Sequence, residues 1–459
     1  MKTDVAVIGA GPVGLLVANL LGRRRRSVTI VEKRSEPYSW PRAIHFDGEA
    51  MRCFQAAGLA RSILHHTHVG KGMLFRDRDG TTLVDWSRDQ TPGPMGWHES
   101  YRFYQPGLEQ ELRKGLGRHD CVALREGAAV VDLVNGDDVS LVLEDGSEVV
   151  ARFVVAADGA QSFARQTLGI GFTDLGFCER WLVVDLVLRR RRDDLGDHSI
   201  QFCDPVSPAT YVRGAGNRRR WEFRLCADSP DVLTEAEVWT RLSRWITPAD
   251  AELERATVYT FRSGLADSWM DGNVFLAGDA AHQMPPFMGQ GMCAGVRDAA
   301  NLCWKLDAVL GGADEGMLGT YQSERESNVH AFINTSVSLG QLVNQTSADG
   351  VPRGRMFSIW PNLGPGLGPR DGVGGILVPQ VQAEDGRLAD SVADHGFYIL
   401  AASPISAERL PVQAGASRWL QERSLEGVVV RPDGYALGGF RNRDELAVLE
   451  GLSRTLTPN

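Results

Sequence analysis

Three glycines near the N-terminus have the spacing of a phosphate-binding turn. Gly9, Gly11 and Gly14 form a G-x-G-x-x-G pattern that encloses Pro12 and Val13. In such a turn the first glycine allows a tight bend, the second lets the backbone approach a pyrophosphate, and the third lets a helix pack closely on a strand. The phosphates then lie at the positively polarised start of the helix. The pattern therefore predicts a dinucleotide site, although a glycine-rich turn that binds no nucleotide is the structural alternative.

The elements that must position this turn are also present in the sequence. Residues 4–9 form a short apolar run typical of a buried strand, residues 11–22 have the character of a helix, and residues 27–31 form a second apolar run. We expect a β-α-β unit and hence a parallel sheet. Glu32, at the end of the second strand, can then accept hydrogen bonds from the adenosine ribose. Lys33, the next residue, is also expected to bind the cofactor.

Two later segments resemble the FAD motifs of flavin-dependent aromatic hydroxylases. Residues 155–165 match a DGxxSxxR pattern, and residues 275–286 match the second FAD motif of these enzymes, with the resemblance continuing to Leu306. Together with the N-terminal turn, the motifs cover most of residues 1–330. The chain thus resembles the single-component FAD monooxygenases of the p-hydroxybenzoate hydroxylase fold, and most of all the 3-(3-hydroxyphenyl)propionate hydroxylases.

The resemblance assigns cofactor contacts to the matching positions. Arg42 and Gln105 would contact the FAD phosphates or the ribityl chain, and Asp279 would accept hydrogen bonds from the ribityl hydroxyls. Asp158 would lie near the pyrophosphate and the approach of the nicotinamide, with Arg165 supporting it. Both aspartates follow predicted strands, so each could instead cap the turn that comes after its strand.

The segment after the second motif would lie beside the reactive edge of the flavin. Pro286 follows another proline, so the chain there is extended and lacks backbone donors. The glycines beyond it leave N–H groups free at the start of a predicted helix over residues 289–310, whose polarised end would stabilise an anionic reduced flavin. The cofactor-binding residues expected in this region are Gly278, Asp279, Pro286, Gly289, Gln290, Gly291 and Met292.

Four residues are candidates for contact with the substrate. His45 could help to deprotonate a phenol, Tyr211 lies on a predicted strand of the substrate sheet, and Arg224 could hold a carboxylate by two hydrogen bonds. Pro286 would lie where oxygen reacts. Alternatively, His45 has a structural role and Arg224 faces the solvent.

One position departs from the family pattern. Where relatives commonly have asparagine, this chain has Cys293. Because a thiol is a weak donor and acceptor, an amide contact near the flavin would be lost. A redox role for this thiol is an alternative, but the sequence contains no CxxC motif.

The remaining patterns predict an α/β protein with three parts. Residues 1–70, 101–175 and 266–340 would form an FAD-binding Rossmann-like domain, and residues 71–100 and 176–265 an inserted substrate domain with a mixed or antiparallel sheet. Residues 341–459 resemble a thioredoxin-like C-terminal domain, reached through a Gly/Pro-rich stretch at residues 361–375. This domain contains no cysteine, which excludes dithiol chemistry and favours a role in packing or in forming a homodimer.

Composition indicates which partners and which cellular compartment to expect. The 459 residues carry a net charge of −9, which disfavours nucleic acid as a partner. Seven scattered cysteines without a CxxC motif or zinc spacing are typical of a reducing cytoplasm and indicate no metal site. We find no targeting signal, and the glycines, proline and flanking charges of the apolar segment at residues 5–22 argue against a membrane span.

The function implied by the resemblance is FAD-dependent hydroxylation of a phenolic compound such as a phenylpropanoid acid. FAD would be bound and O2 would be a co-substrate reacting through a flavin C4a-hydroperoxide. NAD(P)H would bind transiently, since no second G-x-G-x-x-G follows a strand. Two alternatives stay open: a tailoring hydroxylase of a polycyclic aromatic natural product, and a flavin-binding protein that no longer hydroxylates. An NAD-dependent dehydrogenase is disfavoured by the two later motifs.

Overall fold

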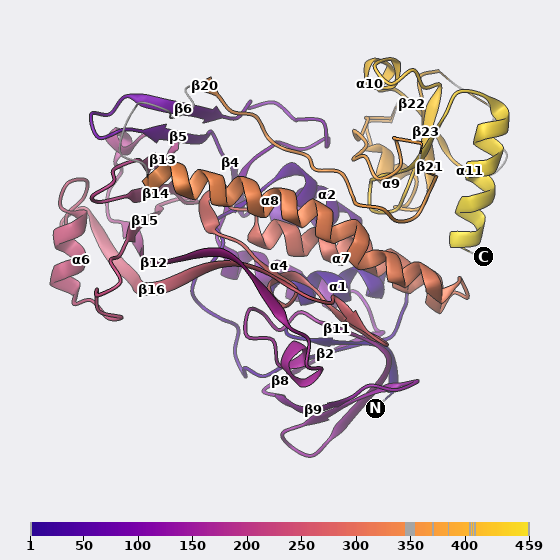
Figure 1. Ribbon diagram of the computed structural model, residues 1–459, viewed down its shortest axis with the longest axis horizontal. Coiled ribbons are helices and arrows are strands. Elements are labelled where there is room, and N and C mark those ends of the chain that lie inside the picture. The colour runs from indigo at the N-terminus through magenta and orange to yellow at the C-terminus, as the bar shows by residue number, and fades with distance from the viewer. Residues whose placement is uncertain are drawn as a thin grey trace.

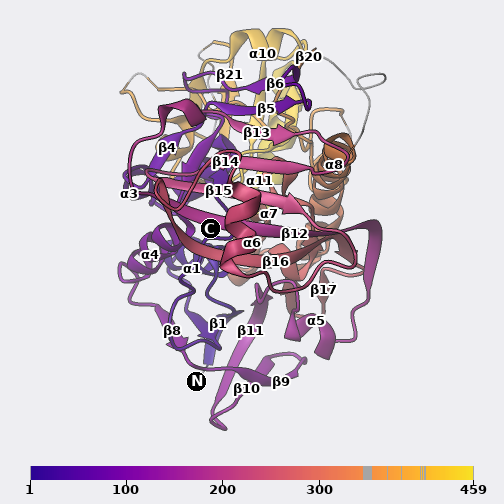
Figure 2. The ribbon, with the colours of Figure 1, turned by 90° about the vertical axis from the view of Figure 1, so that its left-hand side faces the viewer.

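Two large sheets form the body of the molecule in the computed structural model (Figures 1 and 2), which describes residues 2–344, 354–369, 371–383, 385–403, 405, 407 and 410–457. The first sheet has the strand order β17-β18-β11-β1-β2-β8, and β10 pairs with β11 on one side and with β9 on the other. These strands are β1 (Lys2–Ile8), β2 (Val28–Glu32), β8 (Val122–Glu126), β9 (Val130–Val134), β10 (Val139–Leu143), β11 (Glu148–Ala156), β17 (Met270–Asp271) and β18 (Val274–Leu276).

The predicted β-α-β unit at the start of the chain is confirmed. Strands β1 and β2 are parallel, and α1 (Pro12–Arg23) connects them. The second half of β1 is buried, since Val5, Ala6 and Val7 all pack in the core, as expected for a parallel sheet covered on both faces. Helices α4 (Gln105–Leu116) and α7 (Gly291–Leu310) lie against α1.

The segment around residue 150 corrects one prediction. The turn signal at Asp145 and Gly146 predicts a hairpin over residues 141–150, and the apolar run at residues 153–157 predicts a separate buried strand. The hairpin is present, but its second strand and the buried strand are one long strand, β11. Its first part pairs antiparallel with β10, and its later part runs parallel to β1 and β18. The alternating start and the uniformly apolar end of β11 reflect these two environments, because only the later part is buried on both faces.

The second sheet is mixed and has the order β19-β16-β12-β15-β14-β13-β5-β6-β20. The alternating pattern of residues 71–86 around Asp79 and Gly80 predicts a hairpin, and the patterns at residues 181–188, 210–213 and 221–226 predict strands. The hairpin and the three strands are present in this sheet. Helix α6 (Glu235–Leu242) covers one face of this sheet (Figure 2), where Trp221 and Phe223 pack with Val238. Its strands are β5 (Gly72–Arg76), β6 (Thr82–Ser87), β12 (Phe172–Leu188), β13 (Ser199–Phe202), β14 (Ala209–Arg213), β15 (Arg218–Arg224), β16 (Ala251–Ala266), β19 (His282–Gln283) and β20 (Gly354–Arg355).

A smaller unit near the C-terminus has its own sheet, of order β22-β21-β23-β24, and lies at one corner of the molecule (Figure 1). It comprises β21 (Tyr398–Ala401), β22 (Val412–Ala414), β23 (Gly427–Val430), β24 (Ala436–Phe440), α9 (Ala389–Val392), α10 (Ser417–Gln421) and α11 (Arg443–Leu456). The stretch at residues 361–375, of which all but residue 370 is described, leads into it, and its Gly364 N–H donates to the Glu324 carbonyl of the long helix α8 (Thr320–Asn344) at 2.8 Å. This stretch is therefore held in place as well as connecting two units.

A three-stranded sheet, β3 (His45–Phe46), β7 (Tyr101–Phe103) and β4 (Thr67–Val69), and helix α2 (Gly48–Ala56) complete the surroundings of the site. Within the described ranges no helix has both the length and the apolar character that crossing a membrane requires.

Candidate active site

A cavity of about 600 Å³ extends from one large sheet to the other. At one end it is lined by residues that follow the carboxyl ends of β1, β11 and β18, namely Gly11, Ala157 and Gly278. At the other end its wall is the second sheet, with Val183 of β12 and Glu222 of β15. Ligands of open α/β sheets bind at the carboxyl ends of parallel strands, so the first end is the expected nucleotide site.

The glycine turn has the geometry that its sequence predicts. Gly9 has a φ of +100°, and a Cβ there would lie 2.6 Å from the Ala157 carbonyl oxygen. A Cβ on Gly14 would lie 2.0 Å from the Gly9 carbonyl oxygen, so only glycine lets α1 pack so closely. A Cβ on Gly11 would meet no atom within 4 Å, and Pro12 and Val13 line the cavity beside it. The start of α1 thus faces open space.

Glu32 lies next to this turn. Its carboxylate accepts hydrogen bonds from the Ala10 N–H at 2.7 Å and the Arg34 N–H at 3.0 Å. Glu32 therefore braces the turn at the edge of the nucleotide end, while Lys33 is exposed. Neither is among the described residues that line the cavity.

Arg42 and Gln105 both line the cavity. The Gln105 side-chain oxygen accepts hydrogen bonds from the N–H groups of Arg42, at 3.2 Å, and Ala43, at 2.7 Å. The exposed Arg42 guanidinium lies over the Tyr38 ring, 4.7 Å from its centroid. Gln105 thus holds the backbone of the loop that presents Arg42 to the cavity.

Arg165 links the two later motifs. Its guanidinium donates to the carbonyl oxygens of Ala160 at 3.0 Å and Ala280 at 2.8 Å. One oxygen of Asp158 accepts from the Ala164 N–H at 3.1 Å, whereas the other is buried and has no hydrogen-bond partner among the described residues. Asp158 itself lies just behind the lining residues 157 and 159. Its unpaired oxygen is an acceptor left over beside the nucleotide end.

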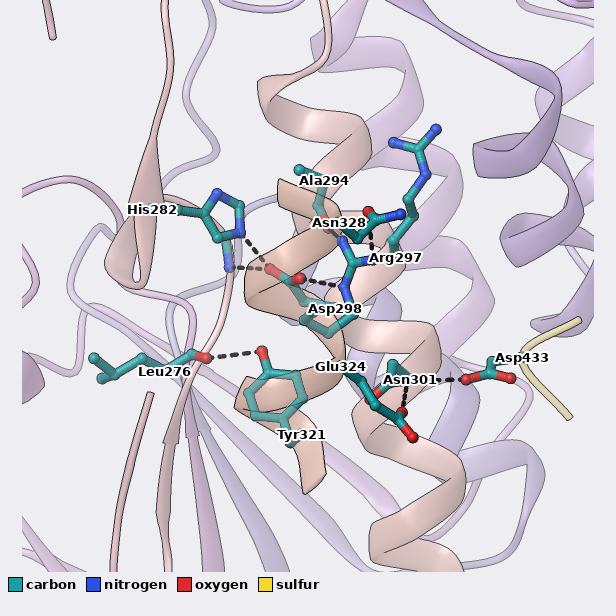
Figure 3. Close-up of polar contacts among 12 residues, drawn as sticks. Leu276, His282, Ala294, Arg297, Asp298, Asn301, Tyr321, Glu324, Asn328 and Asp433 are labelled. Atoms are coloured by element: carbon teal, nitrogen blue, oxygen red, sulfur yellow. Dashed lines mark hydrogen bonds and ion pairs between the residues drawn. The ribbon is translucent and has the colours of Figure 1, made fainter. Parts of the chain in front are cut away.

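Asp298 is a buried aspartate that no sequence motif marked; it holds the turn at Gly278 and lies beside His282 (Figure 3). One oxygen of Asp298 accepts from the Gly278 N–H at 3.0 Å and lies 2.6 Å from His282 Nε2, and the other accepts from Arg325 at 2.8 Å. These cationic and donor neighbours overcome the effect of burial and lower the Asp298 pKa to about 2. Asp279 lines the cavity, and desolvation by the surrounding protein raises the pKa of its carboxyl.

Pro286 and the residues after it form a third part of the lining. A 3-10 turn at Pro286–Met288 ends in Gly289, whose φ is +65°. A Cβ on Gly289 would lie 3.0 Å from His45 Nδ1, so glycine permits close contact between this loop and β3. Gly291 and Met292 begin α7 at the cavity surface. The start of a second helix therefore also faces the cavity.

Gln290 and Cys293 are placed differently from their neighbours. Gln290 is buried, and its side-chain oxygen accepts from Arg297 at 3.0 Å. Cys293 is fully buried, and burial raises the pKa of its thiol. Neither is among the described residues that line the cavity. Gln290 thus anchors the loop, and the Cys293 thiol is protonated and enclosed, which disfavours a redox role.

Tyr211 and Arg224 do not lie where the sequence analysis expected them, since neither is among the described residues that line the cavity. Side chains alternate along a strand, so Thr210 and Val212 face the cavity while Tyr211 packs on Trp221 in the opposite core. Arg224 is exposed at the end of β15. The structure therefore replaces the expected substrate contacts of these two residues with a packing role and a solvent position.

The second sheet is tied to the loop that carries Arg42. Arg220 and Arg255 both pair with the buried Asp185, at 2.7 Å and 2.6 Å. Arg220 also donates to the Arg42 carbonyl oxygen, and both arginines donate to the Pro41 carbonyl oxygen, each at 2.7 Å. Two cations on one carboxylate thus fix the distance between the wall and the nucleotide end.

His45 and Arg88 both line the cavity. Burial lowers the pKa of His45 to about 4, so its imidazole is neutral near pH 7 and a weak base. Arg88 stacks on Trp86, 4.3 Å from the ring centroid, and its guanidinium makes no hydrogen bond or ion pair with any described residue. Arg88 is therefore a cation with free donors inside the cavity, and no motif in the sequence marked it.

The residues of the nucleotide end fit FAD. Two helix N-termini open onto the cavity, and a glycine without neighbours leaves room for a pyrophosphate. This fold and site define a dinucleotide-binding protein of the flavoprotein type.

Comparison with known proteins agrees with this class. Residues 2–336 match the family described as "FAD binding domain". The chain is 36% identical to a probable NADH-specific resorcinol 4-hydroxylase of Rhodococcus jostii, covering 99% of this chain and 94% of the relative. It is 37% identical to a 3-(3-hydroxy-phenyl)propionate/3-hydroxycinnamic acid hydroxylase of a Mycobacterium species, covering 75% of this chain but only 61% of that relative.

Solved structures share the fold at low sequence identity. The flavin-dependent monooxygenase PieE, in complex with FAD and substrate, has a TM-score of 0.83 at 19% identity and 99% coverage of both chains. Aklavinone-11 hydroxylase with FAD and aklavinone has a TM-score of 0.78 at 23% identity, covering 100% of this chain and 99% of that one. The chain therefore belongs to the FAD-dependent aromatic hydroxylases. It is a flavoprotein monooxygenase that uses FAD, NAD(P)H and O2.

Proposed function

We propose that the protein hydroxylates a small phenolic compound of the resorcinol or 3-(3-hydroxyphenyl)propionate type. The observation that carries this proposal is that one cavity joins the dinucleotide turn to the wall of the second sheet. That wall and the facing loop present apolar side chains suited to an aromatic ring, namely Met73, Trp86, Val183, Val212, Phe261, Met284 and Met288.

FAD, when bound, supplies the redox chemistry, and the chain supplies its position. The start of α1 at Gly11 binds the pyrophosphate, and Glu32 accepts a hydrogen bond from the ribose. Asp279 accepts from the ribityl hydroxyls, with Arg42 beside it. The start of α7 directs partial positive charge at the ring system, where it stabilises negative charge on the reduced flavin.

Arg88 in the cavity wall favours a phenol that carries a carboxylate over a neutral phenol. Arg88 has donors free to bind a carboxylate, which supports an acid such as 3-(3-hydroxyphenyl)propionate. This assignment takes over the role that the sequence analysis gave to Arg224. Resorcinol has no carboxylate, so Arg88 would bind only water when resorcinol occupies the cavity.

The test is a substrate screen with the purified FAD-loaded protein. Resorcinol, 3-(3-hydroxyphenyl)propionate and a polycyclic phenol are each added with NADH or NADPH under labelled O2. We expect one small phenol to stimulate oxidation of the nicotinamide and to gain one labelled oxygen atom. A product from the polycyclic phenol alone would favour the tailoring hydroxylase, and peroxide without product would favour a flavoprotein that no longer hydroxylates.

The three-part division of the chain is also a proposal. Residues 341–459 would form a thioredoxin-like unit, and a sheet with one parallel and two antiparallel strand pairs supports it. We further propose that the protein functions in the cytoplasm, since its seven cysteines are all unpaired, and that the C-terminal unit serves packing or a homodimer. Light scattering of the purified protein tests the dimer.

A further inference from the structure

Glu222 is a buried carboxylate in the wall of the cavity. It lies on β15, paired with Val183 of β12 on one side and Thr210 of β14 on the other, and all three side chains line the cavity. Glu222 is only 6% exposed. A carboxylate is almost never buried to this extent without a partner, so its environment calls for an explanation.

The nearest cation, Arg220, makes only a long ion pair with Glu222 and no hydrogen bond. Arg220 Nη1 lies 3.8 Å from a Glu222 oxygen, beyond hydrogen-bond distance, because the Arg220 donors are committed to Asp185 and to the carbonyl oxygens of the Pro41–Arg42 loop. No described residue donates a hydrogen bond to the Glu222 carboxylate. The carboxylate faces the cavity with no hydrogen-bond donor from the described residues, so it is open to a donor on a ligand.

The neighbouring polar groups cannot supply that donor. The Thr210 hydroxyl already donates to the Gln201 side-chain oxygen at 2.5 Å, and Val183 is apolar. Between Val183 and Thr210, the wall therefore offers a ring-shaped ligand a strong acceptor whose neighbours on the adjacent strands are apolar or already hydrogen-bonded. An aromatic hydroxyl matches this arrangement, because its ring is apolar and its O–H is a donor.

We propose that Glu222 accepts a hydrogen bond from a phenolic hydroxyl of the substrate and takes up its proton as the ring is hydroxylated. The substrate O–H bond breaks, its electron pair stays on the substrate oxygen, and a new O–H bond forms on the carboxylate. The proton passes to water when the product leaves. The step needs no oxidant beyond those of the proposed function, on which this inference rests.

The charged groups around Glu222 make it responsive to pH near neutrality. Burial raises its pKa to about 6, against the opposing effect of Arg220 on its own strand. Asp185 of β12 raises the pKa further, and Arg255 of β16 lowers it. Since only the ionised form accepts the proton, hydroxylation is expected to rise with pH through about 6 and to fall below it.

The experiment compares Glu222→Gln with Glu252→Gln, a matched change at a side chain that is 68% exposed on β16. Each FAD-loaded protein is assayed with the best phenol from the substrate screen, from pH 5 to 8, for labelled product and, by fluorescence titration, for the substrate dissociation constant. In Glu222→Gln we expect kcat to fall on the order of 100-fold, as for loss of a general base, and the rise through pH 6 to disappear from both readouts. Glu252→Gln should match the wild type.

Two further arms separate a chemical role from a structural one. A ring-fluorinated substrate, whose hydroxyl is more acidic, should shrink the Glu222→Gln defect, and Glu222→Asp should keep the pH-dependent rise at a lower rate. A Glu222→Gln protein that keeps the wild-type rate and pH profile overturns the inference, as does one that loses only FAD content or stability. If the wild type converts no phenol, the proposed function itself fails.

Discussion

Arg431 and Glu324 form a buried bidentate ion pair, in which Nη1 and Nη2 of the arginine each donate to one carboxylate oxygen at 2.8 Å. Arg431 follows β23 in the C-terminal unit, and Glu324 lies on α8. Lys305 and Asn301 of α7 donate to the same carboxylate, each at 2.9 Å, and Figure 3 shows Asn301 between Glu324 and Asp433. One carboxylate thus joins the C-terminal unit to the two long helices of the FAD-binding part.

We expect Arg431→Met to destabilise the whole protein. Removing one member of a buried ion pair leaves uncompensated charge and typically costs about 3–5 kcal/mol. Urea unfolding of the FAD-loaded protein measures the loss. The control is Arg418→Met, whose side chain is 93% exposed beside Glu422, and which should change the free energy of unfolding by less than about 1 kcal/mol. Equal effects in the two variants would mean that the C-terminal unit is not held by this pair.

Gly11→Ala and Gly14→Ala should separate cofactor binding from folding. A Cβ on Gly14 clashes with the Gly9 carbonyl oxygen at 2.0 Å even without a ligand, so the apoprotein should lose about 1–3 kcal/mol of stability. A Cβ on Gly11 meets no protein atom within 4 Å, so the apoprotein should keep its stability while FAD binding weakens by about tenfold or more. Thermal unfolding of the apoprotein and titration with FAD give the two readouts. Unchanged FAD affinity in Gly11→Ala would place the pyrophosphate elsewhere.

Arg88→Met tests the choice between an acidic and a neutral phenol. Loss of a charge-assisted hydrogen bond of about 1.5–3 kcal/mol should raise KM for 3-(3-hydroxyphenyl)propionate by about 10- to 100-fold. KM for resorcinol should stay the same, because resorcinol has no carboxylate. Arg224→Met, at an exposed arginine outside the described cavity lining, is the matched control and should alter neither value. A similar rise in KM for both phenols would show that Arg88 supports the pocket and does not bind an anion.

Thiol reactivity should follow burial. Cys178 and Cys226 are exposed, whereas Cys53, Cys203, Cys293 and Cys303 are buried, and burial raises the pKa of all four buried thiols. Titration of the native protein with a thiol reagent at pH 8 should modify the two exposed cysteines rapidly and the half-buried Cys121 slowly. The buried four should react only after denaturation. Rapid loss of FAD together with modification of Cys293 would contradict the enclosed position of that thiol.

Local patterns were enough to predict the nucleotide end of the molecule. The turn from Gly9 to Gly14, strands β1 and β2, and the helix between them depend on contacts between residues near one another in the chain. Such contacts are visible in the sequence as a regular spacing of apolar residues and as glycines at positions that no other residue fits. Strand β11 was divided wrongly because its single strand changes partners midway, and partner identity is not a local property.

The sequence by itself therefore determined that a dinucleotide turn, a parallel sheet and the matching FAD motifs are present. Only the tertiary structure decided which side chains reach the cavity. Glu222 and Arg88 line it, whereas Tyr211 packs in the core on the other side of the sheet. The contact between Asp298 and the Gly278 N–H also appears only in the folded chain. The reason is physical. A side chain's period along a strand shows that alternate residues share a face, but which face meets the cavity depends on what the rest of the chain packs against it.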